Sequence, residues 1–256
     1  MLWNSSAING YAIQATDGNI GTVSDMLFED TSWAVRWLVV DTGNWLPGRK
    51  VLLPFSALGE PDRDLRIIPV KLTMQQVKDS PDIDTQKSVS RQHEAHLYDF
   101  YGLDPYWGGG LYPVSNAMAV PFLAPLAPGE RAEPLAGDVH PLEETGDPHL
   151  RSIDAVTGYH IHAKDGEIGH AAEFLVDDSN WTIRYMTVDT RNWWPGELVL
   201  ISPQSIVKID WSERLIDLSM DRATVKASPP YHRNMTVDGA YEEQFASYYA
   251  LGYPAM

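Results

Sequence analysis

The chain has 256 residues, 44% of them hydrophobic and 21% charged, which is typical of a globular protein with a core of its own. It has no cysteine, which excludes disulfides, thiolate nucleophiles and cysteine-ligated zinc. Its formal net charge of -16 disfavours nucleic acid and anionic lipid surfaces as partners, because both are negatively charged.

The first part of the chain is predicted to consist of short strands joined by turns. Asp17-Gly18 is a hairpin turn signal between two apolar runs, and Gly21 lies where a β-bulge would be useful. The expected strands are 11–15, 20–28, 35–40, 51–53 and 65–70, with a loop over 42–49. A short helix capped by Thr73 and an amphipathic helix over 93–101 follow. Five short strands favour a small closed or nearly closed barrel, because closure removes exposed sheet edges.

The same pattern returns without a gap 148 residues later. The sequence VDTGNWLPG at 40–48 recurs as VDTRNWWPG at 188–196, and the match continues through the amphipathic helix, where Tyr241, Phe245 and Tyr249 are spaced i, i+4. Between the copies lies a segment with eight prolines and a run of three glycines. We therefore predict three segments, namely a first repeat with its terminal helix at 1–103, a Pro/Gly-rich linker at 104–151, and a second repeat with its terminal helix at 152–256.

Two motifs carry a family resemblance. The run Asp17-Gly18-x-Ile20-Gly21 is followed by Trp33-x-Val35-Arg36-x-Leu38-Val39-Val40-Asp41, and the second copy fits equally well. Together these motifs closely resemble the PRC-barrel domain, a fold also found in the photosynthetic reaction-centre H subunit and in a ribosome maturation factor. The resemblance implies an all-β protein with two tandem small barrels, each with short C-terminal helices. It also implies a docking module without known catalysis, since fold alone does not fix function.

The best functional candidates are the two tryptophan loops. Loops lie on the surface, and Trp is enriched among the residues that dominate binding energy at interfaces. The candidate partner-binding residues are Asn44, Trp45, Pro47, Asn192, Trp193, Trp194 and Pro195. The alternative is that each Trp folds back over a barrel mouth or over the other repeat's loop.

A second pattern lies on the strand expected near 160. His160 and His162 alternate on it, so both rings face one side, and His170 follows on the hairpin partner. The first copy has other residue types at the equivalent positions, Ala12, Gln14 and Thr22, and no carboxylate signal accompanies the histidines. We expect no metal site here and no cofactor, although His160 and His162 remain the candidates if a metal binds.

The chain is predicted not to be an enzyme. His93 and His96 are spaced i, i+3 and not i, i+4 as in the zincin helix, and no catalytic or nucleotide-binding motif is present. We therefore expect a non-catalytic protein–protein interaction or assembly module that binds an unknown protein or itself. A small-ligand or metal-binding barrel using the His160/His162 face is the alternative, and an uncharacterised enzyme the third. The most apolar stretch, 117–127, is far shorter than a membrane span needs, so a cytoplasmic protein is expected.

Overall fold

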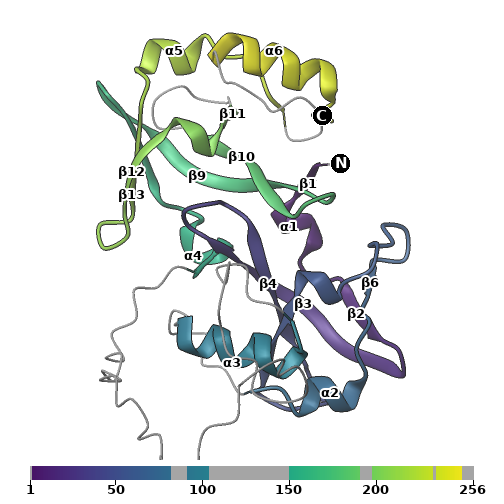
Figure 1. Cartoon of the computed structure of the whole chain (residues 1–256). Coiled ribbons are helices and arrows are strands. Elements are labelled where there is room, and N and C mark those ends of the chain that lie inside the picture. Colours follow the sequence, from purple (N-terminus) through teal and green to yellow (C-terminus); the bar gives the residue numbers. More distant parts are fainter. Residues whose placement is uncertain (1, 82–90, 104–149, 191–197, 233–234, 250–256) are drawn as a thin grey trace, which may run out of the picture. The chain divides into compact units, whose positions relative to one another are not determined.

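The structure is a computed structural model of the whole chain, and it describes all residues except 1, 82–90, 104–149, 191–197, 233–234 and 250–256 (Figure 1). The chain divides into two compact units, one of Met1–Val89 with Pro148–Met256 and the other of Ser90–Asp147. The protein is mostly β, with two sheets and a few short helices, which confirms the predicted fold class.

The first sheet contains the five strands predicted for the first copy. Its strands are β2 (Ala12–Ala15), β3 (Gly18–Glu29), β4 (Val35–Asp41), β5 (Lys50–Pro54) and β6 (Ile67–Pro69), in the spatial order β5-β4-β3-β2-β6. All neighbours are antiparallel except β2 and β6, which are parallel. A 3-10 turn, η1 (Phe55–Ala57), follows β5, and α2 (Met74–Lys78) begins at Thr73 with a capping box.

The second sheet repeats this topology. Its strands are β8 (His160–Ala163), β9 (Gly166–Asp177), β10 (Thr182–Asp189), β11 (Leu198–Ile201), β12 (Ile206–Asp210) and β13 (Leu215–Leu218). Their order is β11-β10-β9-β8-β13-β12, with β8 and β13 parallel. The additional edge strand β12 corresponds to a stretch of the first copy that makes only isolated bridges, at Leu58 and Asp62. A 3-10 turn, η2 (Pro203–Ser205), and α5 (Arg222–Lys226) take the places of η1 and α2.

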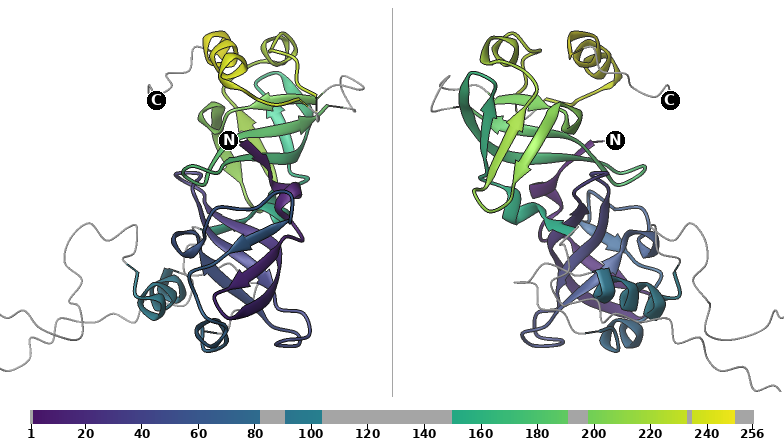
Figure 2. Two further views of the ribbon diagram at one scale, coloured as in Figure 1. Left: turned by 90° about the vertical axis from the view of Figure 1, so that its right-hand side faces the viewer. Right: turned by 60° about the vertical axis from the view of Figure 1, so that its left-hand side comes forward.

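Each sheet curls around a buried core (Figure 2). Within the described ranges no ladder joins β5 to β6 or β11 to β12, so the barrels are nearly closed and not fully closed. The bulge expected beside Gly21 is present, since the pairing of β2 with β3 shifts register after Ile13 and Gly21. A Cβ at Gly21 would overlap the carbonyl of Asp41, so only glycine fits where β3 passes so close to β4.

Equivalent residues of the two copies adopt the same unusual backbone. Trp33 and Trp181 have φ of 59° and 55°, and Arg66 and Arg214 have φ of 54° and 56°, a region that few residues other than glycine occupy. The amide nitrogens of Trp33 and Trp181 donate to the carbonyls of Glu29 and Asp177, respectively. The matching geometry supports the predicted equivalence of the repeats.

The sequence did not predict that the copies exchange a strand. β1 (Leu2–Asn4) pairs with β9 of the second copy, and β7 (Leu150–Ser152) pairs with β3 of the first. The registers agree, since Leu2 lies opposite Asp177 and Leu150 opposite Glu29. Short helices, α1 (Ser5–Ile8) and α4 (Ile153–Val156), then lead into each copy. The predicted domain boundaries stay a prediction, but neither sheet is built from one sequence repeat alone.

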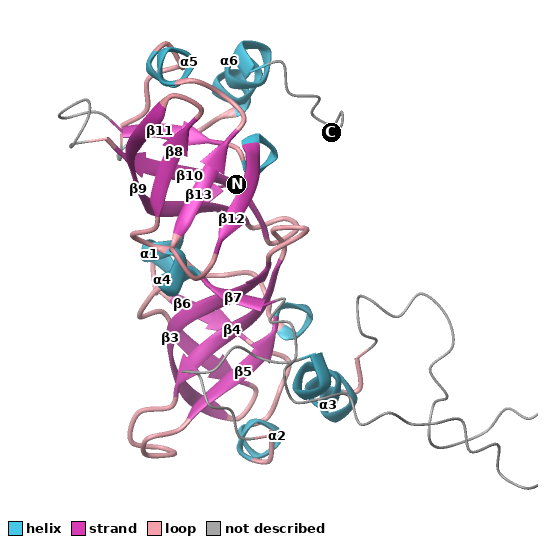
Figure 3. Ribbon diagram, turned by 90° about the vertical axis from the view of Figure 1, so that its left-hand side faces the viewer, coloured by secondary structure: helices cyan, strands magenta, loops and turns pink. Residues whose placement is uncertain are grey.

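The terminal helix of the second copy, α6 (Gly239–Tyr249), packs on its sheet as its i, i+4 pattern predicts (Figure 3). Tyr241 and Phe245 are buried in a cluster with Leu175, Tyr185, Leu200 and Tyr231. The corresponding helix, α3 (Arg91–Tyr101), belongs to the other compact unit. None of the helices within the described ranges has both the length and the apolarity that a membrane crossing requires.

Candidate functional site

The exchanged strands fix the two copies to one another through two matched side-chain clusters. The indole N–H of Trp3 donates to Asp178 of the second copy at 2.8 Å, and the Arg63 guanidinium lies 3.9 Å above the Trp3 ring. At the equivalent place Arg151 donates from Nε to Asp30 at 3.1 Å and lies 3.9 Å above the ring of Trp211. The cation–π pair is therefore present in both copies with the positions of arginine and tryptophan exchanged.

A second link caps the helix that follows β7. Asp25 on β3 accepts hydrogen bonds from the Ser152 hydroxyl and from the backbone N–H of Asp154. Burial raises the pKa of Asp25, while the hydrogen bond from Ser152 acts in the opposite direction. On the other side, Ser6 donates to Glu173, the equivalent of Asp25. These carboxylates hold the exchanged segments in place, and this is a structural role.

A groove of about 730 Å³ lies where the two copies meet. The first copy contributes the turn from Asp30 to Trp33. The second contributes Asn180, residues 182–184 and 202–204, Trp211, and residues 206–209 of the edge strand β12. Val207, at the rim, has 69% of its surface exposed, and the pairing of β12 with β13 is irregular there. The groove therefore combines an exposed apolar side chain with a strand at the edge of its sheet.

The matching place on the other side of the molecule has a smaller cavity and a different aromatic contact. There Phe55 lies 4.3 Å from the ring of Trp181, and the cavity volume is about 510 Å³. In the large groove Pro203 replaces Phe55, and Trp33 instead stacks on Phe28 at 5.1 Å. The large groove therefore has a proline where the other side has an aromatic ring packed on Trp181.

The charged side chains along the groove already pair within the fold. Asp30 accepts from Arg151, Arg184 lies 3.6 Å from Asp177 and 3.2 Å from Glu242, and Lys208 lies 3.4 Å from Asp210. General acid–base chemistry needs a titratable group held free with a displaced pKa. These charges instead stabilise the groove walls.

The first tryptophan loop is held by its own backbone and by Arg49. Thr42 donates its hydroxyl to the carbonyls of Leu46 and Arg49, and the Arg49 guanidinium donates to carbonyls at the end of α2. Asn44 and Pro47 are exposed, while Trp45 is half-buried. The candidates of the second loop, Asn192, Trp193, Trp194 and Pro195, lie outside the described residues.

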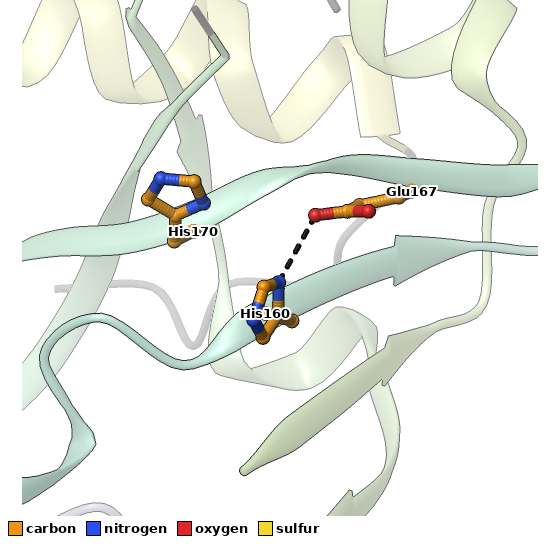
Figure 4. A group of neighbouring side chains, drawn as sticks. All are labelled: His160, Glu167 and His170. Carbon is orange, nitrogen blue, oxygen red and sulfur yellow. Dashed lines mark hydrogen bonds and ion pairs between the residues drawn. The ribbon is translucent and has the colours of Figure 1, made fainter. Parts of the chain in front are cut away.

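The histidines of the second copy gather differently from the sequence prediction. His160 on β8 lies directly opposite His170 on β9, with ring centroids 5.8 Å apart, and Nδ1 of His160 is 3.0 Å from Oε1 of Glu167 (Figure 4). One ligand atom from each of His160, Glu167 and His170 lies within 4.8 Å of the others. His162, which the sequence paired with His160 as a candidate ligand, is not part of this group. Glu167, which belongs to it, was not predicted from the sequence.

The direction of the pKa shift of Glu167 agrees with this geometry. The hydrogen bond with His160 lowers the pKa of Glu167, and the nearby His162 and His170 act in the same direction. Nδ1 of His170 is buried and has no hydrogen-bond partner in the described part of the chain.

The comparison with known families identifies the fold. The model of the PRC-barrel domain matches residues 4–79. This part of the chain is a PRC-barrel domain. No curated protein matches the chain. The matched range runs from the exchanged strand β1 to the end of α2. The second copy lies outside it and has the same strand order with one additional edge strand, β12.

Proposed function

We propose that the chain is a non-catalytic protein–protein interaction or assembly module, in which the two copies present one composite docking surface. The observation that carries the proposal is the 730 Å³ groove lined by both copies, with the exposed Val207 at its rim. A large exposed apolar side chain beside a strand edge favours binding of another protein, because burial of apolar surface drives association. The paired charges along the groove support docking over chemistry.

The Trp45 loop is proposed as a second anchor of the same module. Full burial of an aromatic ring contributes on the order of 4–6 kcal/mol at about 25 cal/mol per Å², before the cost of ordering, and the half-buried Trp45 can supply only part of this. One such anchor gives only weak binding once association costs are met. Two linked anchors can bind together through a high effective concentration, and the exchanged strands link the two copies.

The chain offers a matched pair of substitutions to test the groove. Val207→Glu places a charge at the groove rim. The control, Leu65→Glu, places the same charge on a turn of the first copy, away from the cavities described above. Leu65 and Val207 are both 69% exposed. The unfolding free energy of each variant should therefore stay within about 0.5 kcal/mol of wild type. Cross-linking and affinity capture from the native cell, together with light scattering for self-association, would report binding.

The expected result is loss of the captured protein, or of the oligomer, in Val207→Glu and its retention in Leu65→Glu. Trp45→Ala should weaken the same association without unfolding the barrel. Equal binding by wild type and Val207→Glu would exclude the groove. A measured enzymatic activity that depends on groove residues would exclude a purely non-catalytic role.

A further inference from the structure

We propose that His160, Glu167 and His170 form a binding site for a divalent transition-metal ion of the Zn²⁺ class on the outer surface of the second barrel. Two imidazoles and a carboxylate are a ligand set that suits such an ion and does not suit Mg²⁺ or Ca²⁺, which prefer oxygen ligands. Nothing in the docking function requires this site, so the two proposals stand or fall separately.

The backbone brings the three ligands to one place. His160 and His170 face each other across the β8–β9 ladder, and Glu167 comes from the start of β9, after the hairpin turn. The register shifts between Ile161 and His162, where β9 carries a bulge. A bulge re-aims neighbouring side chains, which explains how Glu167 comes to lie beside His160 (Figure 4).

The distances allow closure around an ion by side-chain rotation alone. In a tetrahedral site with bonds of about 2.0–2.2 Å, ligand atoms lie roughly 3.3–3.6 Å apart. The ligand atoms here are within 4.8 Å of one another, and the pair between His160 and Glu167 is already at 3.0 Å. His160 and Glu167 are exposed, so the core does not block rotation of their side chains about an ion.

Within the described part of the chain, one ring nitrogen of His170 has no hydrogen bond that an ion would have to replace. Nδ1 of His170 is buried without a hydrogen-bond partner among the described residues, although buried polar atoms are normally paired. Three protein ligands leave a fourth position for water or for a group from another molecule, which is the arrangement of an exchangeable site and not of a closed structural one.

The first copy provides an internal comparison. The equivalent positions are Ala12, Asn19 and Thr22, which cannot bind zinc as a set, although the same register pairs Ala12 with Thr22. All three ligands are therefore specific to the second copy. Folding constraints alone act on both copies and would not place two histidines and a glutamate together in only one of them.

The test is calorimetric titration of the full chain, freed of metal by a chelator, with Zn²⁺ and separately with Mg²⁺. We expect one Zn²⁺ site of micromolar affinity and no Mg²⁺ binding. His160→Ala, His170→Ala and Glu167→Gln should each weaken Zn²⁺ binding at least ten-fold, whereas His162→Ala should leave it within two-fold. Co²⁺ should give the absorption of a four-coordinate ion in wild type and lose it in His160→Ala.

Circular dichroism of each variant checks that the fold is kept, which is expected because the altered side chains lie outside the core. Zinc should also raise the melting temperature of wild type and not that of His160→Ala, because an ion that binds only the folded state stabilises it. Absence of stoichiometric Zn²⁺ binding would overturn the proposal. So would binding that survives all three ligand substitutions, or binding that His162→Ala abolishes.

Discussion

The exchanged cation–π pair predicts that Trp3→Arg and Arg63→Trp compensate one another. The second copy already holds the reversed arrangement, with Arg151 over Trp211 at the same 3.9 Å as Arg63 over Trp3. Arg151 also donates to Asp30 as Trp3 donates to Asp178. Each of the two equivalent positions can therefore hold either tryptophan or arginine, provided that the side chain stacked on it is of the other type.

The magnitudes follow from the surroundings of Trp3, which is 6% exposed. Trp3→Arg loses part of an aromatic burial worth on the order of 4–6 kcal/mol, and the arginine stem recovers part of it, so a net loss of about 2–4 kcal/mol is expected. Arg63→Trp alone loses a cation–π contact of about 0.5–2 kcal/mol. In Trp3→Arg the new guanidinium also lies beside that of Arg63 and repels it. The double variant removes this repulsion and restores the cation–π contact, so it should be about 1–2 kcal/mol more stable than the sum of the single effects.

Urea unfolding of wild type, both single variants and the double variant measures this coupling energy. The control cycle combines Trp3→Arg with Leu65→Trp, which places the same ring on an exposed neighbouring position and should be additive to within about 0.5 kcal/mol. A double variant no more stable than additivity predicts would refute the idea that the two clusters are equivalent.

Three further predictions concern stability. Gly169→Ala should cost more than about 2 kcal/mol in urea unfolding because its Cβ would overlap the Asp189 carbonyl, whereas Gly43→Ala, with open space around it, should cost about 1 kcal/mol. Burial raises the folded-state pKa of Asp25, so its contribution favours folding at low pH and is lost as pH rises through that pKa. Asp25→Asn should flatten this part of the profile of unfolding free energy against pH. Phe245→Ala should cost about 3–5 kcal/mol and expose α6 amides to hydrogen exchange, because the ring is fully buried in the α6 cluster.

The sequence predicted the local elements well because their signals are local. The turn at Asp17-Gly18, the cap at Thr73 and the i, i+4 stripe of α6 each depend on residues a few positions apart. β1 and β7 were missed for the same reason: each has three residues, too few to show an alternation, and each pairs with a strand of the other copy. Nothing near Leu2 in the chain identifies Asp177 as its neighbour.

The histidine group shows a second limit of sequence reasoning. Period-two alternation correctly places His160 and His162 on one strand, but neighbours across a ladder depend on register. The bulge in β9 shifts that register, so that Glu167 becomes the hydrogen-bond partner of His160. The close approach of β9 to β10 at Gly169 accompanies this bulge, and a lone glycine in the sequence does not say which residues it will bring together.

Both candidate sites lie where the copies differ. The large groove has Pro203 where the first copy has Phe55, and the metal ligands stand where the first copy has Ala12, Asn19 and Thr22. The shared features, by contrast, are those that folding requires, such as the positive φ of both Trp33 and Trp181. Differences between the copies are thus the places to look for functions that the common fold does not itself provide.

The metal site should accordingly be transferable to the first copy. Ala12 lies opposite Thr22, and the bulge beside Gly21 places Asn19 as the equivalent bulge places Glu167. The triple variant Ala12→His, Asn19→Glu and Thr22→His should therefore raise the Zn²⁺ stoichiometry from one to two, because none of the three positions is buried and the backbone is already in register. The same variant with Gln in place of Glu at position 19 lacks the carboxylate and should bind the second ion at least ten-fold more weakly. If the second copy binds Zn²⁺ and the triple variant still binds only one ion, the strand register does not create the site by itself, and something other than the bulged β8–β9 ladder must assemble the His160 group.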